Sequence, residues 1–88
     1  MSKDTVVSST TGRIYNPKDS IRIIDLRQQR LYLRHNLTLL DVYHSQKNGR
    51  IYVVMVFDKQ ESYPYYLQWQ ARTLNEPDDI EDEDGDVS

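Results

Sequence analysis

Residue types that commonly carry out catalysis or bind metal ions are scarce in this chain of 88 residues and stand apart from one another. His35 and His44 are its two histidines, it has no cysteine, and neither histidine belongs to a cluster with the spacing of a zinc site. Ser8, Ser9 and Ser62 lack the strand–turn–helix context of a nucleophile elbow, and the three glycines form no phosphate-binding loop. The sequence therefore predicts a protein that is not an enzyme, with no catalytic residues, no metal and no cofactor.

Three carboxylates, Asp25, Asp41 and Asp58, each lie at an end or on a face of an expected helix or strand. Helix capping or solvation explains such positions, so we expect no catalytic carboxylate pair. An enzyme would then need a site assembled by oligomerisation or by a cofactor, and no set of residues indicates either one.

A basic pattern is the most informative polar feature. Arg27, Arg30 and Arg34 are spaced three and four residues apart, beside Gln28 and Gln29, so they line up on one side of an expected helix. Pairs of like charges at this spacing cost roughly 0.2–0.5 kcal/mol each, which favours a compensating anion: a nearby acid, a phosphate or the protein's own tail. We predict that these three arginines bind a partner, with a solvated helix face as the alternative.

The charges are divided between a basic body and an acidic end. Eight of the fourteen acids lie in residues 76–88, which contain no base, whereas residues 1–75 hold all eleven Lys and Arg against six acids, a net charge of +5. One hypothesis is that the arginines meet the phosphates of a nucleic acid and that the tail competes for them as a tethered phosphate mimic. Pairing of the arginines with Asp41, Asp58 or Glu61 would count against it.

Aromatic residues gather in the last expected helix, at Tyr63, Tyr65, Tyr66 and Trp69. The helical period places Tyr66 on the inward face, whereas Tyr65 and Trp69, at i and i+4, lie on a different face. Aromatic residues are enriched at interface cores because they bury a large area and keep a polar end. We predict that Tyr65 and Trp69 contact a partner, with packing in the core as the alternative.

The leading hypothesis is a small non-enzymatic binding or adaptor protein that docks on a protein partner, or on itself, through the aromatic helix and an open sheet edge. Nucleic-acid association through the arginines is the alternative. Residues 1–16 contain no apolar run resembling a signal peptide, no stretch approaches the roughly 20 apolar residues of a membrane span, and a chain without cysteine lacks the disulfides of a small secreted scaffold. We therefore expect a cytoplasmic protein with no membrane contact and no small-molecule substrate.

A single α+β domain is expected over residues 20–75, in the order β-α-β-β-α, with an antiparallel hairpin packed against two helices. Residues 1–19 are polar and are expected to be a flexible arm, and residues 76–88 a disordered acidic tail.

Local signals place the elements of this domain. Asp25 and Gln28 resemble a capping box at the start of the first helix, and Asn36 can end that helix in the left-handed conformation. Leu33 is expected on its buried face. Asn48-Gly49 predicts a tight hairpin whose second strand is apolar on both faces and therefore central. Phe57 on that strand is expected in the core, and Ser62 is the expected N-cap of the last helix.

The order of these elements resembles a family of short bacterial and phage proteins of unknown function, the DUF5659-like proteins. The resemblance covers residues 21–74 and is carried by segments 23–26, 31–33, 37–42, 49–50 and 54–58. Two positions depart from the pattern: Gln29 stands where a small apolar residue is expected, and Asn36 where glycine is expected. The resemblance implies a compact βαββα unit of phage or mobile-element origin, and it carries no functional residue across.

Overall fold

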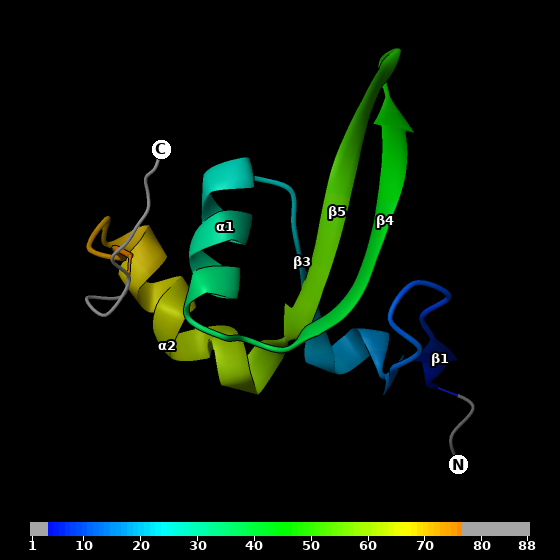
Figure 1. Cartoon of the computed structure of the whole chain (residues 1–88), viewed down its shortest axis with the longest axis horizontal. Coiled ribbons are helices and arrows are strands. Elements are labelled where there is room, and N and C mark those ends of the chain that lie inside the picture. Colours follow the sequence, from blue (N-terminus) through cyan, green and yellow to red (C-terminus); the bar gives the residue numbers. More distant parts are fainter. Residues whose placement is uncertain (1–3, 77–88) are drawn as a thin grey trace, which may run out of the picture.

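The predicted α+β class is confirmed in a computed structural model that describes residues 4–76 (Figure 1). Its elements are β1 (Val6–Val7), β2 (Ile14–Tyr15), the short 3-10 helix η1 (Pro17–Asp19), β3 (Ser20–Ile23), α1 (Leu26–Arg34), β4 (Leu39–Lys47), β5 (Arg50–Asp58) and α2 (Lys59–Gln70). From β3 onward this is the predicted β-α-β-β-α order. The acidic tail lies outside the described residues, apart from Glu76.

The main sheet is antiparallel in the order β3-β5-β4, so β5 is central as predicted. Asn48 and Gly49 both have positive φ, 55° and 79°, and Lys47 pairs with Arg50 across them. This is the backbone of a two-residue hairpin turn whose twist matches that of the strands. Figure 1 shows the β4–β5 hairpin rising beyond α1, with both helices on one side of the sheet and β1 on the other.

Residues 4–19 differ from the flexible arm that the sequence predicts. β1 and β2 form a small antiparallel sheet, and Asn16 caps η1 through its side chain. The hydroxyl groups of Thr10 and Thr11 donate to the carbonyl oxygens of Val42 and Leu40, at 3.0 and 2.7 Å. Composition alone suggested too little apolar surface for order. The segment is instead held against β4 by side-chain hydroxyl groups, which such a measure does not count.

The core forms where the two helices cover one face of the sheet. Its buried members are Ile23, Leu31, Tyr32, Leu37, Phe57 and Leu74. The rings of Tyr32 and Phe57 meet edge to face, with centroids 5.2 Å apart. The prediction for Phe57 is therefore confirmed.

The buried face of α1 is not the predicted one. Leu33 is 38% exposed, whereas Leu31 is 1% exposed. The buried residues of the helix are Gln28, Gln29, Leu31 and Tyr32, so two glutamines share the inward face with two apolar residues. The leucine spacing that predicted Leu33 on the buried face therefore selected the wrong side of the helix.

Gln29 explains why a polar residue belongs on that face. Its side-chain Nε2 donates to the carbonyl oxygen of Ile23 at 2.7 Å and to that of Val53 at 2.9 Å. Ile23 is the last residue of β3, and Val53 lies on β5 just beyond the end of the β3 pairing. The buried amide therefore pairs two carbonyl oxygens that the short strand leaves without a partner, as buried polar groups require.

Both ends of α1 follow the local signals. The Asp25 carboxylate accepts the backbone N–H of Gln28 at 3.0 Å, but the Gln28 side chain donates to the Tyr32 hydroxyl rather than completing a capping box. Asn36 has a φ of 64°, and the N–H of Leu37 donates to the carbonyl of Tyr32 at 3.1 Å. The predicted left-handed end is therefore confirmed, as a Schellman motif.

The start of α2 differs from the prediction. Asp58, rather than Ser62, is the N-cap, and its carboxylate accepts the N–H of Glu61 at 2.9 Å. Ser62 lies inside the helix and is fully buried, with its hydroxyl donating to the carbonyl of Asp58 at 2.7 Å. The helix ends at Gln70 in a second Schellman motif, in which Arg72 has a φ of 62°.

Candidate interaction surfaces

The arginines of α1 meet the first acid of the tail. Arg30 Nε lies 3.1 Å from one carboxylate oxygen of Glu76, and Arg34 Nε lies 2.8 Å from the other. We call Arg27, Arg30 and Arg34 the arginine stripe. Glu76 therefore bridges two members of this stripe, although it is 42 residues from Arg34 in sequence.

The chain that carries Glu76 is anchored just before it. Leu74 is buried in the core cluster, and the carbonyl oxygen of Asn75 lies 2.7 Å from His35 Nε2. The His35 ring in turn packs against Tyr65, with centroids 5.0 Å apart. These contacts at the C-terminal end of α1 explain how Glu76 is brought over the stripe, and they give His35 a structural role.

The positive stripe changes the acidity of Glu76. The hydrogen bond from Arg34 is the largest cause and lowers the pKa of this carboxyl, while desolvation opposes it in part. The charges of Arg30, Arg34 and Arg27 lower the pKa further. Glu76 therefore remains ionised to a lower pH than an ordinary glutamate.

Acids of the body do not pair with the stripe anywhere in residues 4–76. Asp41 accepts hydrogen bonds from Ser8 and Tyr15, Asp58 caps α2, and Glu61 accepts from Thr38. The condition that would count against nucleic-acid binding, pairing of the stripe with these three acids, is therefore not met in the described part of the chain.

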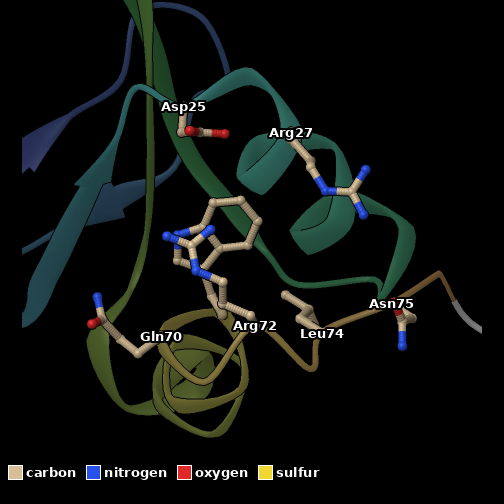
Figure 2. A pocket seen from close by; sticks show the side chains of 7 residues that line it. Asp25, Arg27, Gln70, Arg72, Leu74 and Asn75 are labelled. Carbon is tan, nitrogen blue, oxygen red and sulfur yellow. The ribbon is translucent and has the colours of Figure 1, made fainter.

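Two hollows flank the stripe, and Arg27 lines both. The first, of about 490 Å³, is lined by Asp25, Arg27, Trp69, Gln70, Arg72, Leu74 and Asn75. Figure 2 shows Asp25 and Arg27 on the α1 side of this hollow and Gln70 and Arg72 on the side of the α2 end. The second, of about 340 Å³, is lined by Leu26, Arg27, Arg30, Leu31 and Glu76, and so runs between the tail's first acid and the start of α1.

The aromatic face of α2 is also reversed relative to the prediction. Tyr65 and Trp69 are half-buried and pack against the core, whereas Tyr66, expected inward, is 39% exposed. Tyr63 and Leu67 are exposed as well, at 54% and 48%. Because aromatic or apolar residues occur on both sides of this helix, their period alone does not identify the buried side.

We call Tyr63, Tyr66 and Leu67 the outer α2 face. Beside it lies a hollow of about 290 Å³ lined by Ile21, Lys59, Ser62, Tyr63 and Tyr66. Tyr65 and Trp69, the pair expected to contact a partner, thus pack against the core, and Tyr63 and Tyr66 are the exposed tyrosines of this helix. The true N-cap, Asp58, is a signal that would have corrected the helix start but not its buried side.

A third polar cluster joins the N-terminal segment to the sheet. Asp41 on β4 accepts hydrogen bonds from the Ser8 hydroxyl at 2.6 Å, from the Tyr15 hydroxyl at 2.7 Å and from the N–H of Val42 at 2.8 Å. Desolvation raises the pKa of Asp41, but the three hydrogen bonds outweigh it and the net shift is downward. Burial and the bond to Asp41 raise the pKa of Tyr15 to about 12. The cluster holds the N-terminal segment against β4. The sequence analysis did not predict it, because its members are far apart in the chain.

Comparison with known proteins gives no assignment: no family model, no curated protein and no solved structure matches the chain. The resemblance to DUF5659-like proteins therefore stays a prediction. Within residues 4–76, no group of three or more His, Cys, Asp or Glu side chains gathers as a metal site. In the same residues, no helix combines the length and the apolar character needed to cross a membrane.

Proposed function

We propose that this protein is a non-enzymatic binding protein that docks on a protein partner, a second copy of the chain included, through the outer α2 face. The observation that carries the proposal is the exposure of Tyr63, Tyr66 and Leu67 along one helix, beside a hollow to which Ile21 contributes. Tyrosine suits such a surface because its ring buries a large apolar area while its hydroxyl keeps a polar partner. Exposed apolar side chains that gather in this way mark interaction sites more often than single ones do.

A photo-cross-linking amino acid tests this proposal when it replaces Tyr66 and, as a control, Tyr43. The two tyrosines match in exposure, at 39% and 40%, and Tyr43 lies on β4, away from α2. We expect irradiation to give an adduct of defined mass from position 66, with the purified protein or in cells that express it, and little adduct from position 43. Equal or absent adducts at the two positions would contradict docking through α2.

Nucleic-acid association through the arginine stripe is the second candidate. It is supported by the lack of pairing between the stripe and the acids of the body within residues 4–76. Arginines on one helix face bind phosphates through charge, so such binding weakens steeply with salt. Fluorescence anisotropy with labelled single-stranded DNA and RNA at low salt tests it. Binding by the full-length protein should be lost when Arg27, Arg30 and Arg34 are all replaced by glutamine, and equal binding by that variant would remove this candidate.

A further inference from the structure

The contact between Glu76 and the arginine stripe is incomplete. One carboxylate bridges Arg30 and Arg34, whereas Arg27 makes no ion pair with any residue in the described range 4–76. Arg27 is nevertheless close enough to Glu76 for its charge to lower the pKa of that carboxyl. The stripe therefore carries three positive charges against one described acid.

The surface beyond Glu76 is hollowed toward the unpaired arginine. The hollow of about 340 Å³ has Glu76 and Arg30 in its wall and continues along α1 to Arg27 and Leu26. Leu26, the first residue of α1, has a large apolar side chain that is nevertheless 74% exposed. Along this path the surface is first positively charged and then apolar.

The residues that follow Glu76 have the matching order of side chains. They are Pro77, Asp78, Asp79 and Ile80, two acids and then an apolar residue. An α-helix rises about 1.5 Å per residue, so Arg27 lies about 4.5 Å along the axis from Arg30. Each extended residue spans about 3.3 Å, so two residues beyond Glu76 are enough to reach Arg27.

We infer that residues 77–80 dock along α1 of the same chain, with Asp78 or Asp79 beside Arg27 and Ile80 against Leu26. Glu76 is already held at the stripe, so the next acids are present there at high effective concentration. The positive end of the helix dipole at the start of α1 attracts the same charges. The tail thus completes the neutralisation of the stripe that Glu76 begins.

This inference uses a different surface from the outer α2 face and does not depend on docking there. It bears on the second candidate function, because a nucleic acid that binds the stripe must first displace the tail. A failure of tail docking would leave both proposed functions standing. A failure of nucleic-acid binding would leave tail docking standing, because the tail needs no external ligand.

Carbodiimide cross-linking of the full-length Arg27→Lys protein tests the contact. This reagent joins an amine to a carboxylate only when the two groups touch, and mass spectrometry of the peptides identifies the pair. We expect the introduced amine at position 27 to couple mainly to Asp78 or Asp79. The native Lys47, at the β4–β5 turn, is the internal reference and should not couple to residues 77–88. Salt of about 1 M, with a screening length of about 3 Å, should reduce the coupling several-fold.

Two matched variants of the Arg27→Lys protein complete the test. Asp78→Asn with Asp79→Asn should abolish the coupling, whereas Asp84→Asn with Asp86→Asn removes the same charge and should leave it unchanged. Ile80→Ser should shift the Leu26 methyl signals in NMR spectra, because it removes the apolar contact. The inference is overturned if the introduced amine couples only to Glu76, if it couples equally to all the tail acids, or if it does not couple at all.

Discussion

Leu31→Ala and Leu33→Ala are the same substitution two residues apart on α1, and they should affect stability very differently. Leu31 is 1% exposed and lies in the core cluster with Tyr32 and Phe57, whereas Leu33 is 38% exposed. Truncation of a buried leucine to alanine costs about 2–5 kcal/mol, because it loses the transfer free energy of the side chain and leaves a cavity. At a partly exposed helix position, the loss is about 1 kcal/mol or less, since water fills the space and alanine favours the helix.

Urea unfolding measures this difference, with the single tryptophan, Trp69, as a fluorescence probe because it packs against the core. A domain of this size has roughly 5 kcal/mol of stability, so Leu31→Ala should lose most of its cooperative transition. Leu33→Ala should keep a midpoint close to that of the unmodified protein. The Leu33 variant serves as the matched control, and equal midpoints, or a larger loss at Leu33, would refute the assignment of the buried face of α1.

Three further predictions concern polar groups and backbone. Gln29→Leu should destabilise the fold by about 1–3 kcal/mol in the same urea assay, because it leaves the carbonyl oxygens of Ile23 and Val53 without donors. The pKa of Tyr15 is raised from 10.0 to about 12, so its neutral hydroxyl contributes fully to the free energy of unfolding below pH 10, and this contribution should be lost between pH 10 and about 12. In a series of urea melts over this pH range, Tyr15→Phe should not show that loss. Arg72→Gly should increase the free energy of unfolding by about 0.5–1 kcal/mol and so raise the thermal midpoint, because Arg72 has a φ of 62° and glycine adopts that region without strain.

Local chemistry determined much of the fold from the sequence. Asn48-Gly49 predicted the hairpin because both residues tolerate the positive φ that the turn requires. Asp25 and Asn36 predicted the two ends of α1, since a capping carboxylate and a left-handed residue act within a few positions of their own. The apolar character of β5 on both faces predicted its central place in the sheet.

The candidate surfaces were determined only in part. The arginines of α1 were predicted as one stripe, because residues three and four apart on a helix share a face whatever surrounds them. Their pairing with Glu76 depends on Leu74, Asn75 and His35, which bring the chain back over α1. No spacing rule reaches across 42 residues of sequence.

Tertiary packing alone decided which sides of the helices are buried and whether the N-terminal segment is ordered. Gln29 faces inward because β3 is short and leaves carbonyl oxygens to be paired, a need that arises only when the sheet has formed. Tyr65 and Trp69 face inward on a helix with aromatic residues on both sides. Packing in the core, rather than the helical period, therefore determines which side is buried. Ser8 and Asp41, 33 residues apart, meet only when the N-terminal segment lies against β4. Such contacts join residues that are far apart in sequence, so local spacing and periodicity do not predict them.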